Sequence, residues 1–238
     1  MKILFRIYEV LIMGPLIAVA TIITGAITIA GCLLRGGKWW GYYPPRIWAR
    51  ICLALTFVRV KVSGRENIRP DQSYVFVANH QGAYDIFTIY GYLNHNFKWM
   101  MKKELRNFPV VGKACEAAGH IFVDNSSPAA IMRTMKKAEK TLSGRMSLVV
   151  FPEGSRTFTG RVGTFHKGAY QLAMEFGLPV VPVTIDGAFA VLPRTRLFPN
   201  WGTIRMTIHA PIAAPADDAD RVRVMRQSQQ VIIESLGQ

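Results

Sequence analysis

The sequence predicts an α/β fold. A central domain that is mostly β-sheet is flanked by helices, and membrane-associated helices precede this domain at the amino terminus. Three observations lead to this fold class. A long uncharged apolar run lies near the amino terminus, and from Arg59 onward short apolar segments alternate with amphipathic helical patterns. The third is size: 238 residues with 50% hydrophobic content suffice for one domain and a short appendage. We place membrane-anchoring helices in residues 1–58 and the α/β domain in residues 59–238.

The apolar run extends from Leu11 to Leu34 and contains no charged residue over 24 positions. As a helix it would be about 36 Å long, enough to cross a bilayer core of about 30 Å. Lys2 and Arg6 precede the run. Basic residues also follow it, together with an aromatic cluster suited to a membrane interface: Arg35, Lys38, Trp39, Trp40, Tyr42, Tyr43, Arg46 and Arg50. The run therefore predicts a membrane anchor.

Other interpretations of this segment are possible. Gly14-Pro15 could break the helix, so that the chain enters one leaflet and returns. Ile29-Ala30-Gly31-Cys32 resembles a lipoprotein cleavage site, but the apolar run is longer than the roughly 7–15 residues usual in a signal peptide. A helix buried in a soluble core would need a polar face, which this run lacks. We expect the segment to be retained as an anchor.

The next segment, Ile47 to Val60, is apolar but interrupted by Arg50 and Arg59. Two placements fit this pattern. The helix could lie at the membrane interface with its arginines reaching the headgroups, or it could pack on the domain as an ordinary helix.

Seven apolar segments of the α/β domain are typical of strands. They are Val60 to Val62, Tyr74 to Ala78, Trp99 to Met101, Ile121 to Val123, Leu148 to Phe151, Val180 to Ile185 and Ile204 to Ile208.

Two segments of the domain have the pattern of amphipathic helices. The first begins at Pro128, capped by Ser126 or Ser127, and ends at Gly144. Its expected buried stripe is Ile131, Met135, Ala138 and Leu142, and its charged face is Arg133, Lys136, Lys137 and Lys140. The second begins after Asp217, with an expected buried stripe of Val222, Met225, Ile232 and Leu236.

The charge of the chain indicates an anionic partner. There are 29 Lys and Arg against 15 Asp and Glu, a formal net charge of +14. No zinc-finger spacing, RNP-like run or groove-binding basic helix is present, so we expect no nucleic-acid partner. An anionic bilayer surface suits the apolar amino terminus better. The three cysteines, Cys32, Cys52 and Cys115, are scattered, so we expect free thiols in a reducing compartment and no metal site.

The first chemical motif is Asn79-His80-Gln-Gly-Ala-Tyr-Asp85, which follows a predicted strand. His80 and Asp85 would lie about 140° apart on one continuous helix. They can meet only if His80 lies in the turn and Asp85 is one turn into the helix. An imidazole held in this way can take up a proton while the carboxylate sets its tautomer. Taken alone, such a histidine is more often structural.

The second motif is Phe151-Pro152-Glu153-Gly154-Ser155-Arg156, again at the end of a predicted strand. Gly154 allows the backbone to approach an anion closely, and Arg156 can bind phosphate through two hydrogen bonds. Taken alone, this motif too could be a structural turn.

Together the two motifs resemble the glycerolipid acyltransferase family, which includes the 1-acylglycerol-3-phosphate acyltransferases. Further segments from Tyr74 to Ile185 resemble the same family: Trp99 to Leu105, Gly119 to Asp124, Phe165 to Ala169 and Val180 to Ile185. The resemblance implies an α/β domain resting on the membrane through amino-terminal helices. One residue departs from it: Asn125 stands where the family commonly has arginine, so phosphate binding would fall to Arg156 and Lys102, or the acceptor headgroup differs.

The resemblance also implies the reaction. His80 and Asp85 are the expected catalytic residues, and the expected substrate-binding residues are Asn79, Lys102, Glu153, Gly154, Ser155 and Arg156. His80 would activate the sn-2 hydroxyl of 1-acylglycerol 3-phosphate, and Glu153 would position the glycerol. The product would be phosphatidic acid for phospholipid biosynthesis. No Gly-x-Ser-x-Gly elbow is present, so we expect direct attack on the thioester without an acyl-enzyme.

The expected donor is acyl-CoA or acyl carrier protein, used as a co-substrate, with no cofactor. We expect the catalytic domain on the cytoplasmic face of a membrane, and a bacterial inner membrane in particular. Acylation of another lysolipid or of glycerol 3-phosphate is an alternative. A non-catalytic scaffold that binds anionic lipid is an alternative of another class, but it would have no need for His80, Asp85, Glu153 and Arg156 together.

Overall fold

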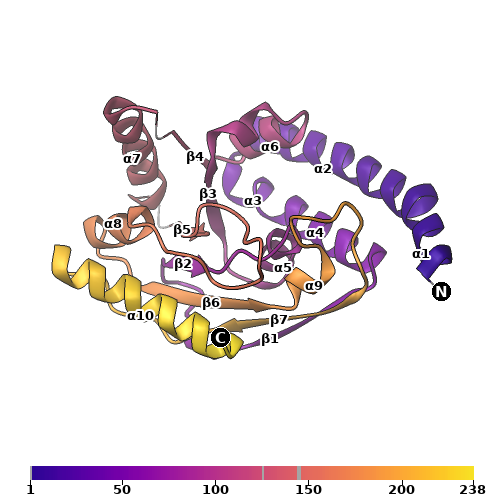
Figure 1. The fold of residues 1–238 in the computed structure, drawn as a ribbon. Helices are drawn as coiled ribbons and strands as arrows, with labels where there is room; N and C mark the ends of the chain where they lie inside the picture. Colours follow the sequence, from indigo (N-terminus) through magenta and orange to yellow (C-terminus); the bar gives the residue numbers. More distant parts are fainter. Residues whose placement is uncertain (1, 125, 144–145) are drawn as a thin grey trace.

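The computed structural model describes residues 2–124, 126–143 and 146–238 and contains one mixed sheet within them. Its strands are β1 (Val58–Ser63), β2 (Val75–Ala78), β3 (Phe97–Lys102), β4 (Ile121–Val123), β5 (Ser147–Val150), β6 (Val180–Asp186) and β7 (Gly202–Ile208). They lie in the order β1-β7-β6-β2-β5-β3-β4, and all neighbours are parallel except β6 and β7 (Figure 1). The α/β fold class is confirmed, and each of the seven predicted segments contributes to one of these strands.

The central strands are buried on both faces because helices cover both sides of the sheet. In β2, Phe76 and Ala78 contribute to one hydrophobic core, whereas Val75 and Val77 contribute to the other. This alternation follows from the two-residue period of a strand. Strands β2 and β5 contain no exposed residue, which is typical of central parallel strands.

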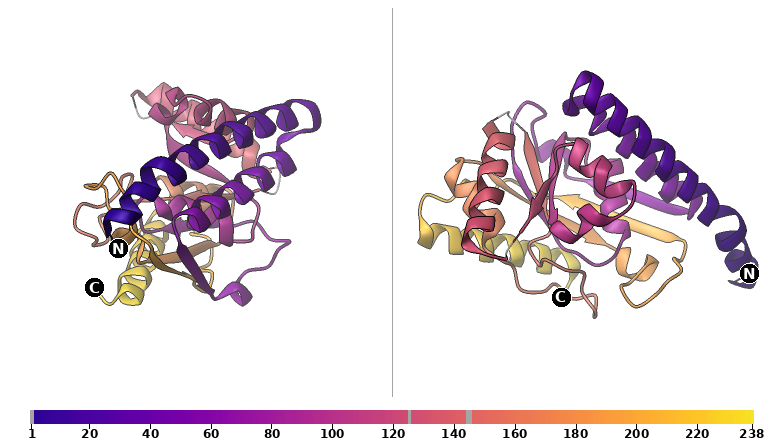
Figure 2. Two further views of the ribbon diagram at one scale, coloured as in Figure 1. Left: turned by 90° about the vertical axis from the view of Figure 1, so that its right-hand side faces the viewer. Right: turned by 90° about the horizontal axis from the view of Figure 1, so that it is seen from above.

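Three helices line the first core and three line the second. Helices α4 (Tyr43–Leu55), α5 (Tyr84–Tyr92) and α9 (Ala188–Val191) contribute residues to the core that contains Phe76. Helices α7 (Pro128–Ser143), α8 (Gly168–Glu175) and α10 (Asp218–Leu236) contribute residues to the core that contains Val75 (Figure 2). Shorter elements complete the fold: α3 (Gly37–Trp40), α6 (Val111–Ala117) and the 3₁₀ turns Arg65–Asn67 and Lys103–Asn107.

The amino terminus forms one continuous helical rod, made of α1 (Lys2–Tyr8), a π-helical segment (Glu9–Met13) and α2 (Gly14–Arg35) (Figures 1 and 2). The chain does not break at Gly14-Pro15. The Gly14 N–H bonds to the Glu9 carbonyl, five residues back, so the wider π turn accommodates a proline that lacks the amide of a normal helical bond. Among the described residues, Ile3–Arg35 is the one helix long and apolar enough to cross a membrane.

One face of α2 packs on the domain and the other is exposed. Two glycines allow the helix to approach the domain closely. A Cβ added at Gly25 would lie 2.3 Å from Val110 Cγ1, and one added at Gly31 would lie 2.3 Å from Trp40 Cδ2. The exposed face is apolar and consists of Leu16, Val19, Ile22, Ile23 and Ile27. Exposed apolar surface of this extent is typical of a membrane contact. The helix therefore lies along the domain and presents a continuous apolar face.

Helix α4 combines both placements predicted for its segment. Ala49 and Leu53 are buried against the domain, and the Arg50 Nε donates to the Gly91 carbonyl oxygen at 2.9 Å. Arg50 therefore binds the domain through Nε, and its contact with lipid headgroups stays a prediction. Ile47, 60% exposed, remains on the outer face of the helix.

The predicted buried stripes of two helices are correct in part. In α7, Ala138 is buried as predicted, together with Ala130 and Thr134, but Ile131 is 45% exposed. In α10, Ile232 is buried as predicted and so is Val224, but Val222 is exposed. Adjacent residues lie only about 100° apart around a helix. Where both neighbours are small or apolar, periodicity alone does not determine which of them faces the core. The predicted helix end at Gly144 lies outside the described residues.

The predicted helix starts agree with the structure. The Ser127 Oγ accepts from the Ala130 N–H at 3.2 Å at the start of α7, and the Asp217 Oδ1 accepts from the Asp220 N–H at 2.8 Å at the start of α10. Both are side-chain caps of free helical amides.

The exposed face of α2 leads to a prediction about membrane association. We expect the full-length protein to remain with membranes in high salt, because apolar burial is not screened, and to be released by detergent. Ile23→Asp should weaken retention, since a carboxylate at the centre of a bilayer costs about 2.5–3.5 kcal/mol. The control is Ile131→Asp on α7, another exposed isoleucine. Salt release of the unmodified protein would contradict an apolar anchor.

Candidate active site

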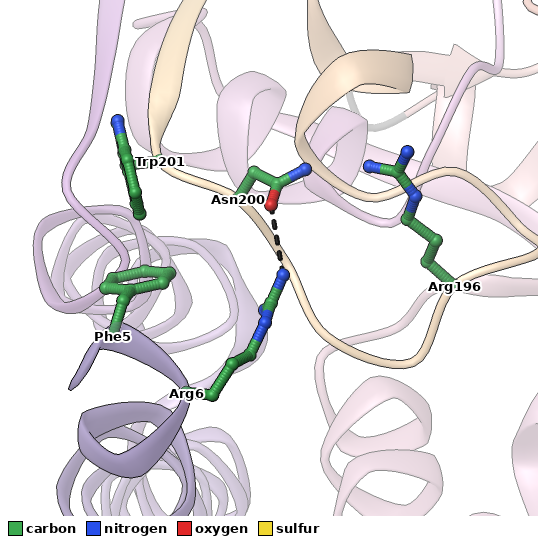
Figure 3. A pocket seen from close by; sticks show the side chains of 5 residues that line it. All are labelled: Phe5, Arg6, Arg196, Asn200 and Trp201. Atoms are coloured by element: carbon green, nitrogen blue, oxygen red, sulfur yellow. Dashed lines mark hydrogen bonds between the residues drawn. The ribbon is translucent and has the colours of Figure 1, made fainter. Parts of the chain in front are cut away.

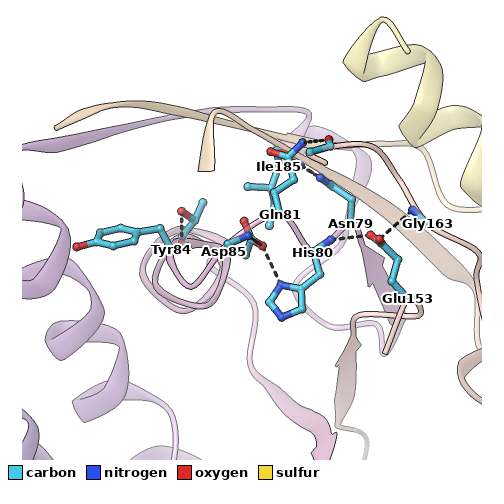
Figure 4. Close-up of polar contacts among 11 residues, drawn as sticks. Asn79, His80, Gln81, Tyr84, Asp85, Glu153, Gly163 and Ile185 are labelled. Carbon is cyan, nitrogen blue, oxygen red and sulfur yellow. Dashed lines mark hydrogen bonds and ion pairs between the residues drawn. The ribbon is translucent and has the colours of Figure 1, made fainter. Parts of the chain in front are cut away.

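His80 and Asp85 meet where β2 leads into α5. Strand β2 ends at Ala78, His80 lies in the following turn, and Asp85 is the second residue of α5. The His80 Nδ1 lies 2.8 Å from the Asp85 Oδ2 (Figure 4). The predicted approach of the two side chains is confirmed, with Asp85 in the first turn of the helix.

The Asp85 carboxylate is held in place from several directions. The residue is fully buried, and its Oδ2 also accepts from the Gly82 N–H at 2.8 Å. The start of α5 adds the positive end of the helix dipole. Because an ionised carboxylate is only an acceptor, His80 must carry its proton on Nδ1 to donate to it, which leaves the Nε2 lone pair free to act as a base.

Phe151 fixes the plane of the His80 ring. Its ring lies parallel to the imidazole, with centroids 3.9 Å apart and an interplanar angle of 7°. Trp99 stacks in turn on Phe151 at 5.3 Å. Stacking and the Nδ1 bond together define one orientation of an imidazole whose side chain is 14% exposed. No role for Phe151 was predicted; its position at the end of a predicted strand, where the second motif begins, was the available signal.

Glu153 binds the backbone on both sides of the site. Its Oε1 accepts from the His80 N–H at 2.8 Å, and its Oε2 accepts from the Gly163 N–H at 2.9 Å. Burial raises the pKa of the Glu153 carboxyl, while these two backbone bonds act in the opposite direction. Both oxygens are engaged, so the structure gives Glu153 a role in holding the His80 turn, and its contact with the glycerol stays a prediction.

The second motif thus holds both backbone groups of His80. The Glu153 Oε1 accepts from the His80 N–H, and Thr157, the residue directly after the motif, donates its N–H to the His80 carbonyl oxygen at 2.9 Å. The sheet explains this arrangement, because β2 and β5 are parallel neighbours with Val77 opposite Val150. Their carboxyl ends therefore open at the same edge, where α/β sheets commonly place sites.

Asn79 has a structural position. Its side chain is fully buried, the Nδ2 donates to the Ile185 carbonyl oxygen at 2.9 Å, and the Oδ1 accepts from the Ile185 N–H at 2.8 Å. These bonds connect the end of β2 to β6. Both groups of the Asn79 amide are used within the protein, and substrate contact by Asn79 stays a prediction.

Gly154 and Ser155 lie exposed at the tip of the second motif. Gly154 has φ +70°, a left-handed conformation that favours glycine, and its N–H donates to the Phe151 carbonyl oxygen at 3.0 Å. Glycine is therefore required for this turn. Contact of either residue with substrate stays a prediction.

Arg156 and Lys102 are the two cations that the motifs predict for phosphate binding. Arg156 is half-buried and precedes Thr157, which is bonded to His80, and Lys102 is the exposed last residue of β3. Within residues 2–124, 126–143 and 146–238, neither side chain has a hydrogen-bond or ion-pair partner. Both are thus free to bind an anion. Asn125, the departure from the family pattern, lies outside the described residues.

The part of the chain that the structure describes contains no group of three or more His, Cys, Asp or Glu side chains that could hold a metal ion. Cys32, Cys52 and Cys115 are free thiols, and burial raises the pKa of each.

The model of the family described as Acyltransferase matches residues 59–186, more than half of the chain. The chain belongs to this acyltransferase family. The matched region contains both motifs and six of the seven strands. It leaves out the amino-terminal rod, β7 and α10.

Several relatives within the family are similar to this chain. The chloroplastic 1-acyl-sn-glycerol-3-phosphate acyltransferase LPAT1 of Arabidopsis thaliana is 32% identical over 72% of this chain and 48% of its own length. The yeast 1-acyl-sn-glycerol-3-phosphate acyltransferase is 31% identical over 68% of this chain and 54% of its own. The chain thus spans about half the length of the curated relatives it matches.

A solved acyltransferase is similar over the whole chain. The crystal structure of the 1-acyl-sn-glycerophosphate acyltransferase PlsC from Thermotoga maritima has a TM-score of 0.82 and 25% sequence identity, covering 99% of this chain and 98% of that one. The likeness therefore includes the amino-terminal rod as well as the acyltransferase domain.

Proposed function

We propose that the protein transfers a fatty acyl group from acyl-CoA or acyl carrier protein to the sn-2 hydroxyl of 1-acylglycerol 3-phosphate, making phosphatidic acid. The observation that carries this proposal is the His80–Asp85 pair, with Nδ1 and Oδ2 2.8 Å apart. Arg156, which precedes the residue bonded to the His80 backbone, has no hydrogen-bond or ion-pair partner among the described residues. The named activities of the relatives and of the solved structure support it. A scaffold that only binds lipid would not need a histidine whose tautomer, plane and backbone are all held.

The chemistry follows from the free Nε2 of His80. As the acceptor hydroxyl oxygen attacks the thioester carbonyl, Nε2 takes its proton, and the buried Asp85 carboxylate stabilises the imidazolium that forms. Collapse of the tetrahedral intermediate breaks the C–S bond. The proton on Nε2 then passes to the leaving thiolate, so the free thiol and the ester are the products. No covalent acyl-enzyme forms, and no cofactor takes part.

Arg156 and Lys102 would hold the phosphate of the acceptor. Arg156 can bind phosphate through two charge-assisted hydrogen bonds, and Lys102 adds a second positive charge from the neighbouring edge. Exposed Gly154 and Ser155 would line the same region. The acyl chains would reach the site from the bilayer, against which α2 rests through its apolar face.

The proposed location is a membrane surface with the site on the cytoplasmic side, because thioesters of CoA and of acyl carrier protein are cytosolic. A bacterial inner membrane with anionic lipids suits the charge of +14.

An assay of purified full-length protein in mixed micelles tests the proposal. The acceptors would be lysophosphatidic acid, lysophosphatidylcholine and glycerol 3-phosphate, each with acyl-CoA and with acyl carrier protein as donor. We expect labelled phosphatidic acid as the principal product. Turnover of lysophosphatidylcholine above lysophosphatidic acid would contradict the acceptor, and absence of transfer with every pair would contradict the enzyme.

Arg156→Ala should mainly raise the apparent KM for lysophosphatidic acid. A charge-assisted hydrogen bond contributes about 1.5–3 kcal/mol, which corresponds to roughly ten- to hundredfold in KM if the contact is equal in the ground and transition states. The matched control is Arg161→Ala, an exposed arginine of the same loop. An effect confined to donor kinetics would contradict the phosphate assignment.

A further inference from the structure

A pocket lies at the start of the amino-terminal rod, separate from the His80 site. It has a volume of about 480 Å³ and is lined by Phe5, Arg6, Arg196, Asn200 and Trp201 (Figure 3). The first two residues belong to α1, and the other three to the loop between α9 and β7. Two segments distant in sequence therefore form its walls.

Arg6 joins the two walls. Its guanidinium bonds to the Glu9 carboxylate, donates to the Pro199 carbonyl oxygen at 2.8 Å and donates to the Asn200 Oδ1 at 3.1 Å. Glu9 is 2% exposed and lies on the same helical rod. The charge of Arg6 is thus balanced by Glu9, and the contacts hold the rod to the loop.

Arg196 supplies the charge that is not balanced. It is exposed, and among the residues the structure describes its side chain has no hydrogen-bond or ion-pair partner. In Figure 3 the Asn200 side chain lies between Arg6 and Arg196. The pocket therefore carries a net positive charge and presents two guanidinium groups, one of them without an internal anion.

Exposed apolar and aromatic side chains adjoin the lining residues in sequence on both walls of the pocket. They are Ile3 (78%) and Leu4 (72%) before Phe5, and Leu197 (83%) and Phe198 (40%) after Arg196; Trp201 (45%) lines the pocket itself. The Trp201 ring packs edge-on against Phe5, with centroids 4.7 Å apart. Arginine together with exposed tryptophan, phenylalanine and leucine is the composition typical of a membrane interface, where apolar groups enter the lipid and cations meet phosphates.

The loop that carries Arg196 also reaches the active site. Pro193 forms a backbone bridge with Gly82, the donor to Asp85, and Arg194 lies over the ring of Phe158 at 4.3 Å. Whatever binds at Arg196 is therefore connected by a short segment to the turn that holds His80.

We propose that this pocket binds the phosphate of an anionic bilayer lipid that is not the substrate. Arg196 makes the charge-assisted contact, the exposed edge of Arg6 adds to it, and the acyl chains lie beside Ile3, Leu4 and Leu197. The lipid would hold the loop from Pro193 to Trp201 at the bilayer surface and so set the mouth of the active site at headgroup level. The proposal does not depend on the acyl acceptor and concerns a site distinct from Arg156.

Native mass spectrometry of the full-length protein, released from neutral detergent micelles, tests this site. Phosphatidylglycerol is added, and phosphatidylcholine is the zwitterionic comparison. We expect one retained phosphatidylglycerol that phosphatidylcholine replaces poorly. Arg196→Gln should weaken this binding roughly tenfold or more, as expected for loss of a charge-assisted contact with a phosphate. The thermal midpoint should change little, because within the described part of the chain the Arg196 side chain has no hydrogen-bond or ion-pair partner.

Two control variants remove the same charge elsewhere. Arg194 lies in the same loop but stacks on Phe158, and Arg65 lies beyond the far end of β1. We expect Arg194→Gln and Arg65→Gln to retain the lipid. Equal losses in Arg194→Gln and Arg196→Gln would mean diffuse surface attraction and would overturn the pocket.

Further arms separate the remaining outcomes. Loss of the lipid in Arg156→Gln but not in Arg196→Gln would place it in the acceptor site and overturn the proposal, whatever the acyl-transfer assay shows. Equal retention of phosphatidylcholine would mean that apolar contact alone holds the lipid and would overturn the proposal.

Millimolar inorganic phosphate should leave the lipid bound, because inorganic phosphate lacks the acyl chains. Complete displacement by inorganic phosphate would assign the pocket to a free anion.

Discussion

Replacing His80 by alanine is expected to lower kcat by at least about 10²-fold, the lower range for loss of a general base. The bond between Nδ1 and Asp85 holds the imidazole at the junction of the two motifs and leaves Nε2 available as the base. Steady-state rates with acyl-CoA and lysophosphatidic acid measure the effect. The fold should persist, because His80 is bound mainly through its backbone, to Glu153 and Thr157. Circular dichroism and the thermal midpoint serve as the folding control.

Asp85→Asn should be nearly as severe as His80→Ala. The amide can donate to Nδ1, which favours the tautomer with the proton on Nε2 and removes the base, and it no longer stabilises the imidazolium. In the double variant the loss should be far less than the product of the two single losses, because the side chains act as a unit. A His80→Ala protein that turns over at the rate of the unmodified enzyme would exclude the mechanism.

Glu153→Gln is the second change with a large expected effect. A glutamine offers one acceptor oxygen where the carboxylate offers two, so either the His80 N–H or the Gly163 N–H loses its partner. Loss of a hydrogen bond to a charged group costs about 1.5–3 kcal/mol, or roughly ten- to hundredfold in rate if the turn moves away from its catalytic position. The loss should appear in kcat, whereas KM for the acceptor should change little.

The split between kcat and KM separates two roles for Glu153. If it positions His80 through the backbone, kcat falls; if it binds the glycerol of the acceptor, KM rises. Glu139→Gln, an exposed glutamate on α7, is the matched control and should leave both constants unchanged. A rise in KM at constant kcat would restore the substrate contact inferred from the motif and contradict the structural role.

The strands and the two motifs were predictable because their signals are local. A strand shows itself in a short apolar segment, and the residues that follow it, His80 and Arg156, appear directly in the sequence. The family pattern joined the two motifs, and the resulting approach of His80 to Asp85 is present in the structure. Errors arose where the choice between adjacent residues depended on the partner surface, as with Ile131 and Val222.

The roles of Asn79, Glu153 and Phe151 depended on contacts far along the chain. Asn79 is engaged by Ile185, 106 residues away, and Glu153 holds His80 across 73 residues. A polar residue in a catalytic motif has the same signature whether it faces the substrate or a neighbouring strand. Only the order of the sheet, with β2 between β6 and β5, determines which of these partners is present.

The sequence by itself determined the fold class, the long apolar amino-terminal segment and the residue types of the site, because each depends on residues close together in the chain. The tertiary structure decided the continuity and seating of the helical rod, the orientation of the His80 ring and the pocket at Arg196. These features depend on parallel strand ends meeting at one edge and on α1 lying beside the loop before β7. Backbone and side-chain groups that are distant in sequence acquire their hydrogen-bond partners only in the folded protein, and the function of each polar residue follows from the partner it has.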